Sequence, residues 1–303
     1  MIDFKPIKIE NRENYQRYLF TEKERGCEYS FTNLYLWGRQ NGTILHDHLV
    51  LFSHFNRKSV YPYPVGNADK KPVLDAIIAD AKERGISCRI TSLDAEAKAT
   101  LEELYPGMFC FHCDRDSFDY VYAINDLADL PGRKYQKKRN HCNRFKTDYP
   151  DYTVAPISDE NIGLVQKMAE NWYETKEKEN PKSDFLMERI ALKKALKHYK
   201  ELELEGLILF HADTILAITL GSRISPDTFD IHFEKAYGDI NGAYAIINYE
   251  FARYLRDKYP DVQYLNREDD MGIEGLRIAK ERYFPHHMVE KCWAHLMEEG
   301  YEY

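Results

Sequence analysis

The sequence predicts a mixed α/β fold arranged as two domains, and three observations lead to this prediction. The chain has 303 residues, about twice the usual length of a single domain. Segments with apolar residues every three or four positions are interspersed with short apolar runs bounded by turn residues, which indicates helices and strands in mixed order. The two halves follow a similar order of elements, so we predict one domain over residues 1–149 and a second over residues 150–303.

The second half gives the clearer pattern. Apolar residues at helical spacing run from Ile162 to Trp172, and turn residues at 212–213 and 225–227 separate three apolar runs typical of an antiparallel meander. The predicted elements are helices at 159–178 and 185–199, strands at 206–211, 214–223 and 228–235, a glycine loop at 238–242, a helix at 243–257, a strand at 262–266, a helix at 273–283 and an extended segment at 288–295.

The first half repeats this order less clearly. A basic helix precedes Pro150, where we place the domain boundary. The predicted elements are a helix at 11–24, strands at 34–37, 43–46 and 49–55, a helix at 70–84, a strand at 86–90, a helix at 94–105, strands at 109–113 and 120–124, and a helix at 133–146.

Composition excludes several classes of protein. Hydrophobic residues make up 44% of the chain and charged residues 30%, which is ordinary for a globular protein. The longest apolar runs, such as 215–220, are far shorter than the ~20 residues that span a bilayer, and the first residues lack the apolar core of a signal peptide. Six cysteines are sparse for a disulfide framework in a chain of this length. We therefore expect a cytoplasmic protein with reduced cysteines.

Element order and four sequence strings together resemble a known family. Two helices, three antiparallel strands, a glycine loop, and then helix, strand, helix and strand is the order of the GNAT acyltransferase fold. The strings are SFTNLYLW (30–37), KYQKKRNHCNRF (134–145), IHFEKA (231–236) and YLNREDDMGIEGLRIAKERYFP (264–285). They resemble the C-terminal catalytic domain of phosphatidylglycerol lysyltransferase and its soluble relatives, and the tandem arrangement is similar to that of the Fem peptidyltransferases.

This resemblance implies two tandem GNAT domains and amide- or ester-forming acyl transfer, with the active site in the C-terminal domain. The implied donor is aminoacyl-tRNA, and the acceptor is an amine or hydroxyl group of a small molecule, a peptide or a lipid. Such chemistry requires no metal or redox cofactor. Two alternatives stay open: coenzyme A-dependent N-acetyl transfer, and a catalytically silent module that binds tRNA, a nucleotide or an anionic surface.

The loop 235–242 bears on the coenzyme A alternative. In GNAT acetyltransferases the corresponding loop carries small residues, and N–H groups at the start of the next helix hold the pyrophosphate of coenzyme A. Here Gly238 and Gly242 flank Asp239 and Ile240, so an acidic and a bulky residue stand where the anion would approach. The two glycines either bind substrate through the backbone or only form the turn into the helix.

A polar run follows the strand predicted at 262–266, at the strand end where ligand clefts of open α/β sheets form. Asn266 and Arg267 are predicted to bind substrate, and the planar guanidinium of Arg267 suits a carboxylate or a phosphate. Glu268 or Asp269 would accept a proton from the attacking ammonium. Alternatively, these acids only cap the helix that follows.

Charged side chains on neighbouring elements complete the predicted site, in which Arg267 and Glu268 are expected to lie close to Glu234 and Lys235. Arg277 and Lys280 are three residues apart on one helix face, where they either pair with the acids or reach the same ligand. His232 and Glu234 share a face of their strand, while Lys235 points the other way or into the loop. Glu234 is a second candidate for the base, and Lys235 would stabilise the oxyanion formed during acyl transfer. His232 either binds substrate or is structural.

Seven basic residues and no acidic one lie between Pro131 and Asp148, in a chain whose net charge is -8. This cluster either forms a solvated helix face or binds a polyanion, such as a tRNA acceptor stem, nucleotide phosphates or anionic lipid headgroups. The predicted polyanion-binding residues are Lys134, Lys137, Lys138, Arg139 and Arg144.

No metal site is predicted. The spacing Cys110-x-x-Cys113 occurs without a second pair of ligands, so it indicates buried thiols. His286 and His287, beside Pro285, are predicted to be structural.

Overall fold

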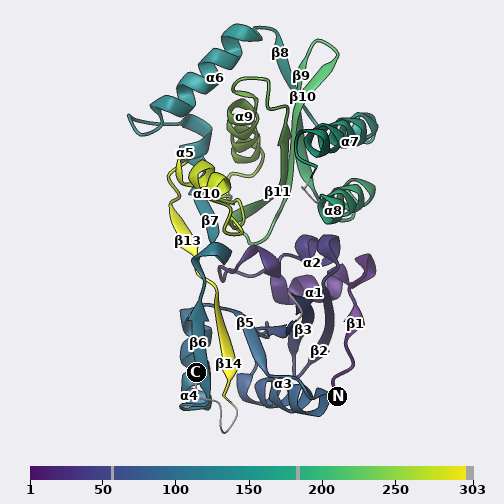
Figure 1. Ribbon diagram of the computed structural model, residues 1–303, viewed down its shortest axis with the longest axis vertical. Helices are drawn as coiled ribbons and strands as arrows, with labels where there is room; N and C mark the ends of the chain where they lie inside the picture. The colour runs from purple at the N-terminus through teal and green to yellow at the C-terminus, as the bar shows by residue number, and fades with distance from the viewer. Residues whose placement is uncertain (56–57, 182–184, 298–303) are drawn as a thin grey trace. The chain divides into compact units, whose positions relative to one another are not determined.

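Two seven-stranded mixed sheets form the framework of the protein (Figure 1). The computed structural model describes residues 1–55, 58–181 and 185–297. The first sheet has the strand order β1-β2-β3-β4-β5-β14-β6, and the second has the order β13-β7-β12-β11-β10-β9-β8. Among the helices of these residues, none combines the length and the apolar character needed to cross a membrane.

The bounds of the elements are as follows. The strands are β1 (Lys5–Pro6), β2 (Gln40–Leu45), β3 (His48–Phe55), β4 (Lys58–Pro62), β5 (Arg89–Leu93), β6 (Phe109–Cys113), β7 (Asp119–Ala123), β8 (Tyr152–Pro156), β9 (Glu205–His211), β10 (Thr214–Arg223), β11 (Thr228–Ala236), β12 (Tyr264–Asn266), β13 (His287–Val289) and β14 (Cys292–Leu296). The helices are α1 (Arg12–Leu19), α2 (Phe31–Trp37), α3 (Lys70–Arg84), α4 (Ala95–Leu104), α5 (Ile124–Asp129), α6 (Gln136–Asp148), α7 (Ile162–Glu179), α8 (Leu186–Lys197), α9 (Ala243–Lys258) and α10 (Glu274–Glu281), with short 3-10 turns at Ile9–Asn11, Cys27–Tyr29 and Arg115–Ser117.

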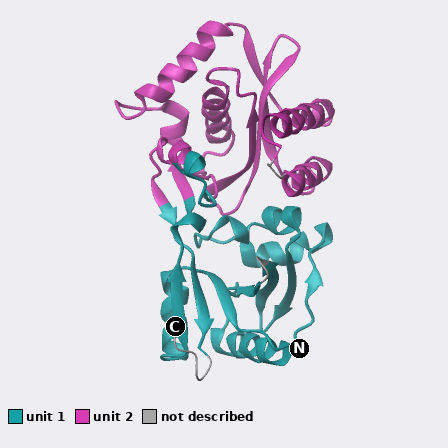
Figure 2. Ribbon diagram, in the orientation of Figure 1, with its two compact units in different colours: residues 1–119, 269–277, 288–303 teal, residues 120–268, 278–287 magenta. Residues whose placement is uncertain are grey.

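The chain forms two compact units whose residues interleave along the sequence (Figure 2). The first unit comprises residues 1–119, 269–277 and 288–303, and the second comprises residues 120–268 and 278–287. These bounds differ from the predicted division at 149/150. The reason is an exchange of strands: β7 pairs with β12 in the second sheet, whereas β14 lies between β5 and β6 in the first.

The second unit has the predicted meander at its centre. Strands β9, β10 and β11 pair antiparallel, and β12 joins β11 in parallel. Helix α9 covers one face of this sheet, and α7 and α8 cover the other (Figure 1). Ile247, Phe251 and Leu255 recur at helical spacing on α9 and are buried. The helices and strands predicted between residues 159 and 266 are therefore confirmed, apart from small differences at their ends.

The first unit buries its core between the sheet and helices α3 and α4. Leu74 and Ile77 of α3, Leu101 of α4 and Ile90 of β5 are fully buried in one cluster. Ala294 of β14 belongs to the same cluster, so the last strand of the chain supplies part of the core. Each residue of this kind stabilises the folded state by removing apolar surface from water.

Residues 34–37 are helical, so the strand predicted there is wrong. They belong to α2, which begins after Ser30 because the Ser30 hydroxyl accepts a hydrogen bond from the N–H of Asn33 at 3.0 Å. Gly38 ends the helix in the left-handed conformation. Strands β1, β4 and β8 and helix α5 were not predicted. Strands β1 and β8 lie at sheet edges and are mostly exposed, so no alternation of apolar residues marks them.

The cysteines also differ from the expectation of reduced, buried thiols. Cys113 of β6 is exposed, and its sulfur forms a disulfide with Cys292 of β14, which lies opposite it in the strand register. Cys110 is half-buried and lies outside this disulfide. Because the bonded cysteines are 179 residues apart, the local spacing of Cys110 and Cys113 did not indicate this pairing.

A buried ion pair lies where the two exchanged strands begin. Asp119 is the first residue of β7, and Lys291 directly precedes β14. The Lys291 ammonium contacts Asp119 Oδ1 at 2.6 Å and Glu28 Oε2 at 2.7 Å. Burial acts to lower the pKa of Lys291, but the charges of Asp119, Cys27 and Glu28 raise it well above its ordinary value. The ammonium is therefore the counter-ion of this carboxylate pair.

Removing one partner of this pair should destabilise the protein. Lys291→Met leaves the fully buried Asp119 carboxylate without its cation, and we expect the free energy of unfolding to fall by about 3–5 kcal/mol. Asp119→Asn should cost less, because Lys291 keeps Glu28. Urea denaturation followed by circular dichroism measures both changes. In the exposed Lys71–Asp75 pair, Lys71→Met should cost no more than about 1 kcal/mol, and equal losses for the two lysine variants would contradict this account.

Candidate functional site

Strands β11 and β12 diverge in the second unit, and the candidate site lies where they part. Their parallel pairing covers only three positions, from Thr228 with Tyr264 to Asp230 with Asn266. Strand β11 continues to Ala236, whereas β12 ends at Asn266, after which the backbone of Arg267 and Glu268 bonds to Tyr120 of β7. Ligands of open α/β sheets bind where neighbouring strands diverge in this way.

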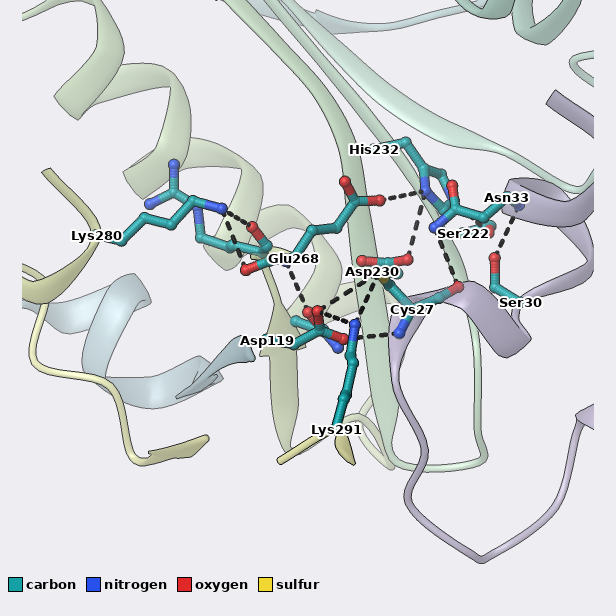
Figure 3. A network of polar contacts seen from close by, with 12 residues as sticks. Cys27, Ser30, Asn33, Asp119, Ser222, Asp230, His232, Glu268, Lys280 and Lys291 are labelled. Atoms are coloured by element: carbon teal, nitrogen blue, oxygen red, sulfur yellow. Dashed lines mark hydrogen bonds and ion pairs between the residues drawn. The ribbon is translucent and has the colours of Figure 1, made fainter. Parts of the chain in front are cut away.

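The first group of site residues surrounds His232 (Figure 3). Its Nε2 lies 2.8 Å from Ser222 Oγ, and its Nδ1 lies 3.4 Å from Asp230 Oδ2 and 3.5 Å from Glu268 Oε1. The side chains of His232 and Asp230 are almost fully buried, whereas that of Glu268 is 24% exposed. Glu268 is therefore the member of this acidic pair that solvent reaches.

A β-bulge explains how His232 meets these groups. Leu220 pairs with Phe233 and Gly221 with Ile231, so His232 is an extra residue in β11 with no partner in the register of β10. Bulges redirect side chains and are frequent beside functional sites. The alternation assumed in the prediction is interrupted here, and His232 and Glu234 accordingly have different partners.

The backbone at Glu268 is held in an uncommon conformation. Its φ is +58°, in the left-handed region that non-glycine residues rarely adopt. The Glu268 N–H donates to Asn266 Oδ1 at 2.7 Å, and the Lys280 ammonium donates to the carbonyl oxygens of Arg267 and Glu268 at 2.5 and 3.1 Å. Asn266 and Lys280 thus position the carboxylate of Glu268. Strain of this kind gathers at functional sites.

The second group of site residues surrounds Arg267. Its guanidinium contacts Glu234 Oε1 at 3.0 Å, and Asn248 of α9 donates to the other oxygen of Glu234 at 3.5 Å. Arg267 and the ammonium of Lys138 both lie over the ring of Tyr283, at 5.1 and 3.4 Å from its centroid. Burial, followed by the charge of Arg267, lowers the pKa of Lys138 to about 8. The predicted proximity of Arg267 to Glu234 is observed.

Lys235 lies apart from this group. Its ammonium pairs with Glu188 of α8 and lies 4.2 Å from the ring centroid of Trp172 on α7. Burial lowers its pKa. The predicted proximity of Lys235 to Arg267 and Glu268 is wrong, because consecutive residues of a strand point to opposite faces and α7 and α8 cover the face that Lys235 reaches.

The acidic residues that follow Arg267 have different roles. The Asp270 carboxylate accepts the N–H of Gly272 at 2.9 Å and pairs with Arg277 at 2.8 Å, so it caps and fixes the turn before α10. Arg277 also pairs with Asp116, within the first unit. Of the two alternatives predicted for Arg277 and Lys280, pairing with the acids holds for Arg277, which contacts Asp270, whereas Lys280 donates to backbone carbonyl oxygens. Asp269 is half-buried and belongs to the first unit.

The glycine loop is closed on one side by α6. Gly242 has φ +84°, and a Cβ atom there would lie 2.5 Å from the carbonyl oxygen of His141 and 3.1 Å from Phe145. The positive φ of Gly242 and its lack of a side chain therefore allow the turn and the close contact with α6. Gly238 has more space, since the nearest atom to its Cβ position is the ammonium of Lys176 at 3.6 Å.

The basic residues of the segment 131–148 have distinct surroundings. Arg139 donates to carbonyl oxygens of Leu130 and Gly132, and the ammonium of Lys138 lies over the ring of Tyr283. Both cations therefore already contact other groups of the protein. Lys137 and Arg144 are exposed on α6, seven residues apart and hence on one face, and Arg144 pairs with Asp148 at 2.7 Å. Lys134 is also exposed and pairs with Asp126 at 3.2 Å.

One group of side chains could also coordinate a metal. Asp230, His232 and Glu268 each offer one ligand atom, and these atoms lie within 4.8 Å of one another. Carboxylate and imidazole ligands of this kind suit zinc and related ions. The sequence pattern predicts no metal, and that stays a prediction.

The comparison with protein families shows to which family the chain belongs. The model of the C-terminal region of phosphatidylglycerol lysyltransferase matches residues 20–295. The chain belongs to this family. A protein of Mycoplasmoides gallisepticum, MYCGA3080, is 24% identical over 179 residues, which are 58% of this chain and 55% of that protein. The match thus spans about half the length of this relative.

Solved structures confirm the fold. A conserved protein of unknown function from Bacteroides thetaiotaomicron is 38% identical, with a TM-score of 0.92 over 98% of this chain and 100% of that one. L-PGS from Bacillus licheniformis matches at 16% identity and a TM-score of 0.67, over 100% and 95% of the two chains. A tandem GNAT protein from the clavulanic acid biosynthesis pathway matches at 9% identity and 0.51, over 98% and 99%. The predicted tandem GNAT fold is therefore confirmed.

Sequence reasoning missed several members of the two groups. Ser222 and Asp230 lie on adjacent strands and were not singled out, although a charged residue two positions before His232 in an apolar strand was a usable signal. Asn248 and Tyr283 come from helix α9 and the segment after α10. Tertiary packing alone brings these elements to the site.

The lowered pKa of Lys138 predicts a pH effect on stability. Between about pH 8 and pH 10 the unfolded chain holds a proton on this lysine that the folded protein has lost, so stability rises with pH. Lys138→Met removes this contribution. The free energy of unfolding of the native protein should therefore increase relative to that of the variant across this range, as measured by urea denaturation. Lys137→Met, at an exposed neighbour, is the control, and a constant difference for Lys138→Met would contradict the prediction.

Proposed function

We propose that the protein is an aminoacyltransferase that moves an aminoacyl group from aminoacyl-tRNA to an amine or hydroxyl acceptor in the cytoplasm. The observation that carries this proposal is the contact between Glu268 and His232 at the divergence of β11 and β12, with Glu268 held in a left-handed conformation. Membership of a family of transferases supports the reaction class. The acceptor is a small molecule, a peptide or a lipid headgroup.

The reaction requires the removal of one proton and the stabilisation of one developing negative charge. The nitrogen or oxygen of the acceptor attacks the ester carbonyl carbon of the donor, a C–N or C–O bond forms, and the ester C–O bond to the tRNA ribose breaks. Glu268 accepts the proton of the attacking group. His232 lies against that carboxylate, and its contacts with Asp230 and Ser222 orient the imidazole. The leaving ribose oxygen then takes up a proton.

The group around Arg267 supplies substrate binding in this proposal. Arg267 and Lys138 carry two positive charges and Glu234 carries one negative charge, so the group has an excess of one positive charge. Such a site favours an anionic or partly negative part of the donor or the acceptor. Tyr283 adds a flat surface under both cations. Asn248 fixes the carboxylate of Glu234 and so maintains the geometry of the pair.

The loop before α9 favours aminoacyl-tRNA over coenzyme A as the donor. A pyrophosphate at the start of α9 would approach Asp239, and the carbonyl oxygen of His141 lies close to Gly242 at the same turn. Both present negative charge or partial charge to the anion, which opposes the attraction of the helix N-terminus. The exposed Lys137 and Arg144 on α6 offer an alternative surface for a polyanion.

Aminoacyl transfer can be measured by the loss of ester from tRNA charged with radiolabelled amino acids, in the presence of amine and lipid acceptors. Glu268→Gln and His232→Asn should each lower the rate by about 10²–10⁴-fold without loss of folding, because proton transfer contributes in this range. The pair of half-buried His198 and exposed Glu201, in the same unit, provides matched controls. Glu201→Gln and His198→Asn should leave the rate unchanged.

Two outcomes would replace the proposal with an alternative. If the native protein leaves every aminoacyl-tRNA intact but releases coenzyme A from acetyl-coenzyme A with an amine acceptor, the protein is an N-acetyltransferase. If it binds tRNA yet accelerates neither reaction, it is a binding module. Rates in Glu268→Gln equal to those of the native protein would remove Glu268 from the mechanism.

Binding of tRNA should depend on the exposed charges of α6. Replacing Lys137 and Arg144 with glutamine removes up to two phosphate contacts, so the slope of log K against log salt should flatten by about 0.7–0.9 for each contact. A salt titration of tRNA binding to the native protein and the double variant measures this change. Lys193→Gln with Lys197→Gln, on α8, alters the net charge equally and should leave the slope unchanged. An identical shift in both double variants would indicate a general charge effect.

A further inference from the structure

A cavity of about 340 Å³ lies within the first unit. Its wall comes from the segment after α1, the loop between β4 and α3, the region between β5 and α4, and the residues before β14. Four basic side chains line it: Lys23, Arg25, Lys70 and Lys291. The partners of these four cations decide what the cavity can bind.

Two of the four cations are neutralised by carboxylates. Lys23 contacts Asp94 at 3.0 Å and Glu96 at 2.8 Å. Lys291 belongs to the buried ion pair with Asp119 described above. These two lysines therefore do not give the cavity an excess of positive charge.

Arg25 and Lys70 have neutral partners. Arg25 donates to Thr21 Oγ1 at 2.7 Å, and the Lys70 ammonium donates to the carbonyl oxygens of Pro64 and Gly66 at 3.2 and 2.5 Å. Among the residues that the structure describes, no carboxylate lies within ion-pair distance of either side chain. The other acids of the wall, Glu24 and Glu290, are exposed, so water and salt screen their charges.

The environment of the two cations is unfavourable for their charge. Burial and, to a smaller extent, the charges of Arg25 and Lys23 lower the pKa of Lys70 to about 8. Burial also lowers the pKa of Arg25, although the nearby Tyr29, Asp94 and Glu96 act to raise it. An anion beside the two side chains would offset the burial of both charges and the repulsion of Lys70 by Arg25 and Lys23.

The remaining wall is aromatic and apolar. The hydroxyl of Tyr29 donates to the carbonyl oxygen of Tyr63 at 3.0 Å, which fixes the buried ring of Tyr29, and Val65 adds aliphatic surface. Ser92, also in the wall, has φ +60°, which is uncommon for a non-glycine residue. Backbone strain of this kind persists where the surrounding structure enforces it, and it gathers at ligand sites.

We propose that this cavity binds a small phosphate monoester with an aromatic or apolar body. A phosphate monoester carries close to two negative charges at neutral pH, which matches Arg25 and Lys70 better than the single charge of a carboxylate. The planar fork of Arg25 suits two phosphate oxygens, and Lys70 provides a compact charge for a third. Tyr29, Tyr63 and Val65 contact the body of the ligand. The site is independent of the proposed acyl transfer, which uses residues of the second unit.

Phenyl phosphate is the probe for this proposal, and isothermal titration calorimetry with the full chain measures its affinity. Arg25→Gln and Lys70→Met should each weaken binding by at least about tenfold, since each removes a charged hydrogen bond. Lys71→Met is the matched control, because Lys71 is the next residue of α3 and pairs with Asp75. Benzoate, with one charge, and inorganic phosphate, without a ring, should both bind more weakly than phenyl phosphate.

Several results would overturn the proposal. They are the absence of phenyl phosphate binding by the native protein, undiminished binding by both variants, and equal binding of benzoate. Equal binding of inorganic phosphate would remove the aromatic part of the inference. Circular dichroism and urea midpoints establish that each variant is folded. If Lys70→Met does not fold, Lys70→Gln keeps a donor for the carbonyl oxygens of Pro64 and Gly66 while removing the charge, and it should weaken binding equally.

Discussion

The exchange of two strands is the constraint on which the rest of the structure depends. Strand β7 comes from the first half of the chain and completes the second sheet, whereas β14 comes from the end of the chain and completes the first. The buried pair of Asp119 and Lys291 lies where these strands begin. Because each sheet needs residues from distant parts of the chain, neither unit is a continuous segment, and a cut at residue 150 would remove a strand from both sheets. Contacts of such high sequence separation also make folding slow.

Short strand pairing in the second unit creates the site. Strands β11 and β12 pair in parallel at only three positions, and beyond them the side chains of Glu234, Arg267 and Glu268 have no cross-strand neighbours between these two strands. Buried polar groups must then find partners among themselves. They do so in two groups, one around His232 and one around Arg267. Glu268 has a left-handed backbone, and its side chain contacts His232, whereas the side chain of the preceding Arg267 contacts Glu234.

The cations of this acidic protein serve three different purposes. Lys291 and Lys280 are buried and hold the backbone or a carboxylate in place. Lys137 and Arg144 are exposed and add charge to the surface. Arg25 and Lys70 line a cavity and donate hydrogen bonds to neutral oxygens. Since the cost of a charge depends on its burial and its counter-ion, these classes cannot be separated by counting basic residues along the sequence.

Local patterns in the sequence determined much of the fold and part of the site. Helical periodicity and turn residues predicted the meander and the helices around it, and the string from Tyr264 to Pro285 indicated the family, because these signals depend on neighbouring residues alone. The contact of Arg267 with Glu234 was also expected. Tertiary structure alone decided the strand exchange, the Cys113–Cys292 disulfide, the bulge at His232 and the separation of Lys235 from the site. Each of these depends on how strands far apart in the chain pair and which face a helix covers, and no short-range pattern carries that information.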